Sequence, residues 1–157
     1  MNYVSRIRTV LILLSLCFSA FSFAATEEAP VDARADYDPN NIFAHILRGE
    51  LPADVVFENK HAMAFHDIRP QARVHVLVIP RGPYANIDQF NLQASDQEKL
   101  GFLDAIRETA KIMGVRESGF RLVANTGLDG GQTVAHMHFH LMGGEYVGNP
   151  REAGPGQ

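Results

Sequence analysis

The chain has 157 residues, and its 14 lysines and arginines against 18 aspartates and glutamates give a formal net charge of −4. This length suits one small domain with its own apolar core, and nothing in the composition indicates repeats or low complexity. A net negative charge argues against a protein that attracts nucleic acid electrostatically, so we expect no nucleic-acid partner.

The first 24 residues have the features of a secretory signal peptide. Arg6 and Arg8 precede an apolar run that extends from Val10 to Phe18, and Ser22-Phe23-Ala24 supplies the small residues that a signal peptidase recognises. We therefore expect a signal peptide over 1–24 and export to the periplasm or the medium, with no stable membrane anchor after cleavage. An uncleaved anchor stays open as an alternative, although the run is shorter than the ~20 apolar residues that span a bilayer.

Residues 25–38 are predicted to form a polar linker, because they carry Glu27, Glu28 and Pro30 and show no periodic apolar face. Cleavage before this linker removes Cys17, the single cysteine, and leaves a net charge of −6, so the mature chain would have neither a disulfide nor a catalytic thiol. The folded domain is expected over 39–157. Its first helix is predicted where apolar residues recur at helical spacing, at Ile42, Phe43, Ile46 and Leu47.

The remaining elements predict an α+β domain with a mostly antiparallel five-stranded sheet and two principal helices. Strands are expected at 55–58, 62–66, 74–79, 120–125 and 134–142. The strand at 74–79 is apolar on both faces and should be central. The second helix begins with a capping box, Ser95 to Glu98. We expect its buried stripe to be Leu100, Leu103, Ile106, Ala110 and Met113.

Three histidines alternate with apolar residues at the end of this series, in the run His136-Met137-His138-Phe139-His140. Alternation with period two is typical of a half-buried strand, so the three imidazoles should share one face. The first and third Cα atoms of such a strand lie roughly 13 Å apart, which is too far for all three to bind one metal ion through bonds of about 2 Å. Two of them could bind a metal with help from elsewhere. A row of imidazoles suits a string of phosphate oxygens better, because one imidazole attacks while its neighbours donate hydrogen bonds.

The residues around this run give it a family resemblance. The run 136–142 resembles the histidine triad motif, and the segments 125–134, 65–72 and 75–80, with Ile42-Phe43 and Gly143-Gly144, are similar in order and spacing to the Hint-like branch of the histidine triad (HIT) proteins. The resemblance covers about residues 40 to 144. It implies a HIT-like fold, a homodimer, no cofactor or metal, and hydrolysis of purine nucleoside phosphoramidates through a covalent nucleotidyl-histidine intermediate.

The resemblance also implies catalytic roles for five residues. His138, the middle histidine, would attack the α-phosphorus, with its tautomer fixed by the backbone carbonyl of His136. His140 would donate a hydrogen bond to the phosphate and stabilise the charge that develops there. His136 and His75 would orient these groups, and the Thr133 hydroxyl would bond the bridging or leaving-group atom.

The nucleotide-binding residues are expected on three other segments. Asp67 can accept hydrogen bonds from both ribose hydroxyls, and His66 beside it would offer backbone contacts. Consecutive glycines before the triad let the backbone approach a phosphate, which places Gly131 and Gln132 at the site, and Asn125 resembles the family's phosphate or ribose contact. An apolar slot for the base would be formed by Ile42, Phe43, Ile46, Phe65, Ile68 and Leu77.

Two other functions stay open. The same triad serves dinucleoside polyphosphate hydrolases, which the products formed from a dinucleoside tetraphosphate would distinguish from a phosphoramidase. The protein could also be an exported nucleotide- or zinc-binding module without turnover. Stoichiometric zinc and no covalent nucleotide adduct would favour that alternative.

Overall fold

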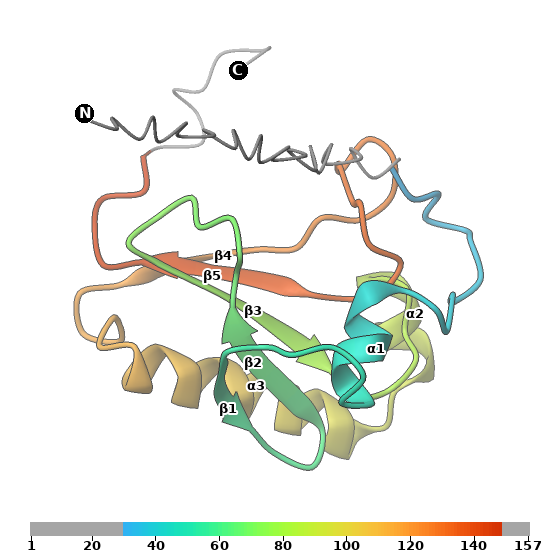
Figure 1. Ribbon diagram of the computed structural model, residues 1–157, viewed down its shortest axis with the longest axis horizontal. Helices are drawn as coiled ribbons and strands as arrows, with labels where there is room; N and C mark the ends of the chain where they lie inside the picture. The colour runs from blue at the N-terminus through green and yellow to red at the C-terminus, as the bar shows by residue number, and fades with distance from the viewer. Residues whose placement is uncertain (1–29, 149–157) are drawn as a thin grey trace, which may run out of the picture.

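The computed structural model describes residues 30–148, so the predicted signal peptide lies outside the described residues. A five-stranded antiparallel sheet with strand order β1-β2-β3-β5-β4 forms the centre of the fold (Figure 1). The α+β fold with a five-stranded antiparallel sheet is therefore confirmed. The strands are β1 (Val55–Glu58), β2 (Ala62–His66), β3 (Val74–Pro80), β4 (Phe120–Val123) and β5 (Phe139–Gly143).

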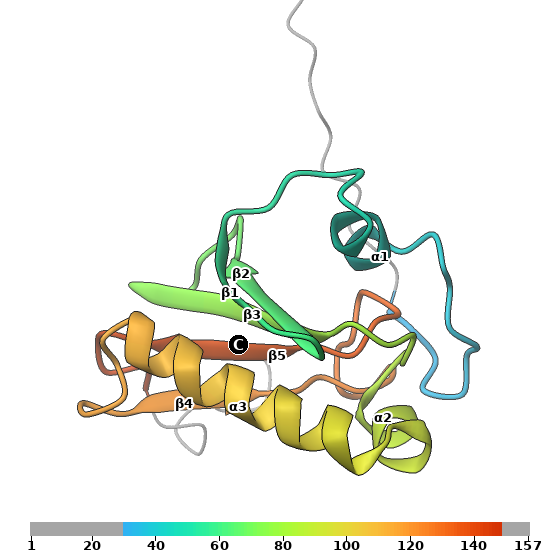
Figure 2. The same ribbon diagram turned by 90° about the horizontal axis from the view of Figure 1, so that it is seen from below.

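Three helices cover the two faces of this sheet. The helices α2 (Ile87–Gln93) and α3 (Asp96–Ile112) lie on one face, and α1 (Ile42–Leu47) lies on the other (Figure 2). Helices were predicted at α1 and α3, whereas α2 was not. It has seven residues and buries only Phe90, so no apolar stripe marks it in the sequence. Within 30–148, no helix is long and apolar enough to cross a membrane.

The strand β3 is central and apolar on both faces, as its sequence predicted. All seven of its residues are buried. Val74, Val76 and Val78 join the core under α2 and α3, whereas Leu77 and Ile79 join a smaller core under α1. Because β3 pairs with β2 on one side and β5 on the other, its position fixes His75 beside His140 of β5.

The buried face of α3 differs from the one predicted. The capping box between Ser95 and Glu98 is present, but Leu100 and Leu103 are 64% and 59% exposed. The helix instead packs on the sheet through the face that carries Phe102, Ala105 and Ile106, and an added Cβ at its Gly101 would lie 2.5 Å from the His61 ring. The prediction followed hydrophobicity rather than this close approach. The buried residues of α3 are Phe102, Ala105, Ile106, Thr109 and Ala110.

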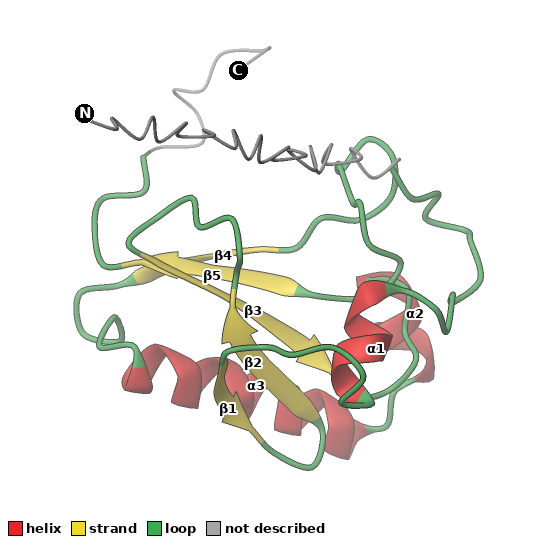
Figure 3. Cartoon of the chain, in the orientation of Figure 1, coloured by secondary structure: helices red, strands yellow, loops and turns green. Residues whose placement is uncertain are grey.

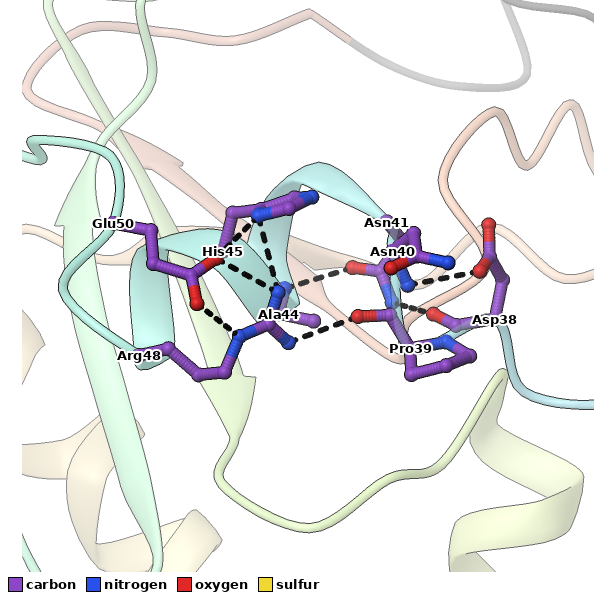
Figure 4. Close-up of polar contacts among 8 residues, drawn as sticks. All are labelled: Asp38, Pro39, Asn40, Asn41, Ala44, His45, Arg48 and Glu50. Carbon is purple, nitrogen blue, oxygen red and sulfur yellow. Dashed lines mark hydrogen bonds and ion pairs between the residues drawn. The ribbon is translucent and has the colours of Figure 1, made fainter.

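Both ends of the short helix α1 are tied down by polar contacts (Figure 4). The Asn41 side chain caps the helix by accepting from the Ala44 amide at 2.9 Å. At the other end, the Arg48 guanidinium donates to the Pro39 carbonyl and to Glu50. Six residues are too few to form a stable helix alone, so these caps help to hold the apolar side of α1 over the sheet.

Candidate active site

The histidine triad crosses the boundary between a loop and a strand. The predicted strand 134–142 is wrong at its start, because β5 begins at Phe139 and the chain before it is loop (Figure 3). The ladder with β3 pairs Phe139 with Val78, and Pro80, two residues further along β3, has no amide hydrogen to donate. The Met137 amide donates instead to the Tyr84 carbonyl at 2.7 Å.

The alternation of side chains persists through this boundary. Met137 and Leu141 are buried in the core under α3, at 2% and 0% exposure. The imidazoles lie on the side of α1, where the Phe43 ring stands edge-on to His138 with ring centroids 5.2 Å apart. The shared face predicted for the histidines therefore holds, even though only His140 belongs to the regular strand.

Hydrogen bonds fix the tautomers of the first two histidines. The Nδ1 atom of His138 lies 2.7 Å from the backbone carbonyl of His136. Because a carbonyl can only accept, Nδ1 must carry the proton, and the Nε2 atom of neutral His138 keeps its lone pair. The Nε2 atom of His136 likewise donates to the Pro80 carbonyl, at 2.9 Å. His138 is thus prepared as a nucleophile at Nε2.

The third histidine, His140, is held in the tautomer opposite to that of His138. The Gln71 amide donates to Nδ1 of His75 at 3.1 Å, so the proton of a neutral His75 lies on Nε2. That atom is 2.9 Å from Nδ1 of His140, which must then accept and place its own proton on Nε2. The series of hydrogen bonds from the Gln71 amide through His75 to His140 therefore leaves a ring N–H donor at Nε2 of His140.

Burial keeps these four imidazoles neutral near pH 7. It lowers the pKa of His136 to about 4 and also lowers the pKa of His138. Burial, followed by the neighbouring His138 and His75, lowers the pKa of His140 to about 4. The pKa of His75 is lowered by its burial. A neutral imidazole is the form that can attack an electrophile.

Asp67 lies next to the His75–His140 pair. One of its carboxylate oxygens accepts from the Arg69 amide at 2.7 Å. The other lies 3.4 Å from Nε2 of His75 and 3.9 Å from Nδ1 of His140. A carboxylate has about four lone-pair directions, so these contacts leave room for further donors such as hydroxyl groups.

A cavity of about 350 Å³ opens beside Asp67. Five residues predicted for the nucleoside line it, namely Ile46, Phe65, His66, Asp67 and Ile68. Two other predicted residues, Phe43 and Leu77, are buried with Phe65 in the core under α1 rather than in the cavity wall. The sequence missed the other wall, Pro52, Ala53 and Asp54.

A second cavity, of about 480 Å³, lies between α1 and the residues before the triad. Thr133 lines this cavity, as does Ile42, which was predicted for the base slot. Asn125 is half-buried and lies two residues beyond Val123, which pairs with His140. Thr133 therefore borders a space separate from the Asp67 cavity, whereas Asn125 lines neither of these two cavities.

The turn before the triad is held by close backbone packing at Gly130 and by the side chain of Gln132. Gly131 has φ of +66° with open space around it, whereas a Cβ on Gly130 would lie 2.3 Å from the Thr126 carbonyl oxygen. The Gln132 side chain is 1% exposed, donates to the Ala85 and Val134 carbonyls and accepts from the Gly127 amide. These bonds occupy its amide, so Gln132 holds the turn together and its side chain is not available to a nucleotide.

Asp67, His75 and His140 form a group whose nitrogen and oxygen atoms all lie within 4.8 Å of one another, which is close enough to hold a metal. A metal-binding histidine normally donates its second ring N–H to an acceptor. Here Nδ1 of His75 instead faces the Gln71 amide, which is itself a donor. Binding a metal at Nε2 would set two donors against each other, so the residues fit a hydrogen-bond relay better than a metal centre.

Comparison with known proteins places this site in a family. A model of the HIT domain matches residues 48–147. The chain belongs to the HIT domain family. It is 48% identical over 112 residues to an uncharacterized 13.2 kDa HIT-like protein of Azospirillum brasilense, covering 71% of this chain and 92% of that protein.

Two solved HIT structures show the same fold. A HIT family hydrolase from Legionella pneumophila Philadelphia 1 matches with a TM-score of 0.66 and 42% identity, over 71% of this chain and 98% of that one. A histidine triad nucleotide-binding protein from Candida albicans matches with a TM-score of 0.59 and 30% identity, over 64% of this chain and 72% of that one.

One residue that contacts the site, Tyr37, lies before the HIT match and was not predicted from the sequence. The Tyr37 hydroxyl lies 2.9 Å from Nδ1 of His136, 99 residues away in the chain. Tyr37 falls inside the predicted linker and carries no motif. Gln71 was missed as well, because it acts through its backbone amide. No pattern of side chains in the sequence points to either contact.

Proposed function

We propose that this protein is a Hint-like nucleotide hydrolase that cleaves the P–N bond of purine nucleoside phosphoramidates. The observation that carries the proposal is the pair of opposite tautomers. His138 has an unprotonated Nε2, whereas His140 has a protonated one. One ring can attack phosphorus while its neighbour, whose centroid is 5.2 Å away, donates to a phosphate oxygen.

The proposed reaction has two steps. Nε2 of His138 attacks the α-phosphorus and the P–N bond breaks; the departing nitrogen takes a proton from solvent and leaves as an amine, while the Thr133 hydroxyl donates a hydrogen bond to it. The nucleotide is then bonded to His138. Water attacks the same phosphorus and the bond to His138 breaks, which releases a nucleoside monophosphate that keeps the hydroxyl of the water, while the other proton of the water returns to solvent. In both steps His140 stabilises the charge on the phosphate oxygens.

The nucleoside is proposed to occupy the cavity of about 350 Å³. Its apolar side supports binding of a flat base, and the Asp67 carboxylate at its edge supports acceptance from the ribose hydroxyls. Apolar walls discriminate poorly between bases, so the purine preference rests on the family resemblance. Only Asp67 among the lining residues has a contact that also reaches the histidines.

The experiment that tests this function is AMP release from adenosine 5′-phosphoramidate by the purified protein, run beside His138→Ala and repeated with a chelator. We expect turnover that the chelator leaves unchanged and that the variant lacks. As a matched control, His61→Ala changes a half-buried histidine in the turn between β1 and β2, which lines neither of the two cavities, and should keep wild-type turnover. A folded wild-type protein without turnover, or a fully active His138→Ala, would contradict the proposal.

The same assay separates the two alternatives from the sequence. A dinucleoside tetraphosphate cleaved faster than the phosphoramidate would identify a dinucleoside polyphosphate hydrolase. Tightly bound zinc together with no turnover of either substrate would identify a binding module, and zinc at the Asp67 group would be lost in His75→Ala.

We further propose that the protein is a homodimer. On the α3 side of the sheet, Leu100 and Leu103 are 64% and 59% exposed, and Phe120 and Leu122 on the edge strand β4 are 37% and 40% exposed. This apolar surface supports a second copy as its partner. Sedimentation should give a dimer for the wild type and a monomer for Leu103→Glu with Leu122→Glu. A wild-type protein that sediments as a monomer at the concentrations used in the activity assay would contradict the proposed homodimer.

Export remains a proposal that rests on residues 1–24 alone. Fractionation of cells that produce the full chain, followed by N-terminal sequencing, should find protein that begins at Ala25 outside the cytoplasm. Protein that keeps residues 1–24 and sediments with membranes would favour the uncleaved anchor instead.

A further inference from the structure

The segment 31–37, which precedes the HIT match, runs along the end of the domain that carries α1, α2 and the turn before the triad (Figure 1). The Val31 amide donates to the Gln132 carbonyl at 2.7 Å. The side chain of Asn86, at the start of α2, donates to the Ala33 carbonyl, and that of Gln89 donates to the Ala35 carbonyl. Three hydrogen bonds therefore fix a segment that was predicted as a linker.

These hydrogen bonds hold the segment so that Tyr37 contacts His136. The two rings meet edge-on with centroids 5.4 Å apart, and the hydroxyl lies 2.9 Å from Nδ1. Since Nε2 of His136 donates to the Pro80 carbonyl, Nδ1 of the neutral ring is an acceptor and the Tyr37 hydroxyl must be the donor. Both ring nitrogens of a residue with 0% exposure are thereby satisfied.

We infer that Tyr37 is a positioning residue, which acts on the nucleophile through His136. The carbonyl that fixes the tautomer of His138 belongs to His136. A His136 ring held at both nitrogens holds its own backbone in place, and therefore holds that carbonyl at 2.7 Å from His138. This inference rests on the proposed function, because it assigns His138 as the nucleophile.

The titratable groups that the structure places against His136 are the Tyr37 hydroxyl and the His138 imidazole, while Phe43 packs edge-on and Pro80 supplies its carbonyl. A hydroxyl that donates to Nδ1 stabilises only the neutral ring, since a protonated ring has no lone pair there. Removing the hydroxyl should therefore make His136 easier to protonate. A positive His136 would oppose the charge that His138 gains during attack.

The test compares Tyr37→Phe, which keeps the ring and removes the hydroxyl, with Tyr146→Phe, the same change at a side chain that is 82% exposed. For Tyr37→Phe we expect kcat on adenosine 5′-phosphoramidate to fall about tenfold, the scale of one lost hydrogen bond. KM should change less than about twofold, because Tyr37 does not touch the proposed nucleoside cavity. Tyr146→Phe should match the wild type.

A second measurement reads His136 directly and needs no turnover. In ¹⁵N-histidine-labelled protein, Tyr37→Phe should raise the pKa of His136 by roughly one unit, and the acid limb of kcat/KM should move the same way. An unchanged His136 titration, with or without a lower kcat, would overturn the inference and leave Tyr37 a structural role. If the wild type lacks turnover, the proposed function fails while the titration still decides whether Tyr37 holds His136.

Discussion

Replacing Gln132 by glutamate would put an oxygen in place of an amide that donates to two backbone carbonyls. These carbonyls belong to Ala85 and Val134, at 2.6 and 2.8 Å. The Val134 carbonyl keeps the His136 amide as a donor, but that of Ala85 loses the donor that Gln132 supplied. An unpaired buried polar group costs about 1–3 kcal/mol, and the variant adds a buried charge. We expect Gln132→Glu to lower the free energy of unfolding by at least about 3 kcal/mol.

The variant Gln132→Ala removes the same hydrogen bonds without adding a charge. It therefore separates the effect of the buried glutamate charge from the loss of the hydrogen bonds. It leaves the Gly127 amide and the Ala85 carbonyl without the partner that Gln132 provides, which predicts a loss of about 2–4 kcal/mol. Gln132→Glu should therefore be less stable than Gln132→Ala at pH 7. Below pH 5 the difference in stability between the two variants should narrow, because a protonated glutamate regains an O–H donor.

The assay is urea unfolding at fixed protein concentration, with KM measured for each variant. Gln97→Glu is the matched control, because Gln97 is exposed in the first turn of α3, where a negative charge is tolerated. A loss below about 1 kcal/mol in Gln132→Glu, together with a KM raised several-fold, would refute the argument. It would assign the Gln132 side chain to the nucleotide instead of to the turn.

Three further predictions concern the histidines and the turn. Wild-type stability should fall as the pH drops from about 6.5 to about 4, because the unfolded histidines bind protons there while the pKa of His136 and that of His140 are lowered to about 4 in the fold; unfolding curves across that range check it. His75→Leu should lower kcat about tenfold with little change in KM, because His140 loses the donor that fixes its tautomer, and a wild-type kcat would remove His75 from the relay. Gly130→Ala should lower the melting temperature by several degrees, because its Cβ would lie 2.3 Å from a backbone oxygen, whereas Gly114→Ala, with φ of +69° and open space, reports the cost of backbone strain alone.

Periodicity in the sequence was enough to place most of the fold. The two apolar faces of β3 and the alternation around the triad depend on side-chain direction alone, and both are present in the structure. The predictions were wrong where the close approach of two elements, and not hydrophobic periodicity, decides which residues are buried or paired. The face of α3 with Phe102, Ala105 and Ile106 packs on the sheet and leaves Leu100 and Leu103 exposed, and the ladder with β3 ends before His138.

The site was predicted less completely, because its orienting groups are mostly backbone atoms or lie far away in the chain. The motif indicated which imidazoles come together but not which nitrogen of each carries a proton. That depends on the carbonyls of Pro80 and His136 and on the Gln71 amide. A carbonyl and an amide look the same in any sequence, since every residue other than proline has both.

This dependence on backbone explains how identical side chains can take opposite roles. A carbonyl faces Nδ1 of His138, so its Nε2 is free to attack, whereas the amide that faces Nδ1 of His75 makes its Nε2 a donor, and His140 becomes a donor in turn. Exchanging one histidine for another residue tests only whether an imidazole is needed. Changing the atoms that face an imidazole, as Tyr37→Phe does at His136, tests which ring nitrogen carries the proton. In the proposed mechanism, the position of this proton distinguishes the nucleophile from the hydrogen-bond donor.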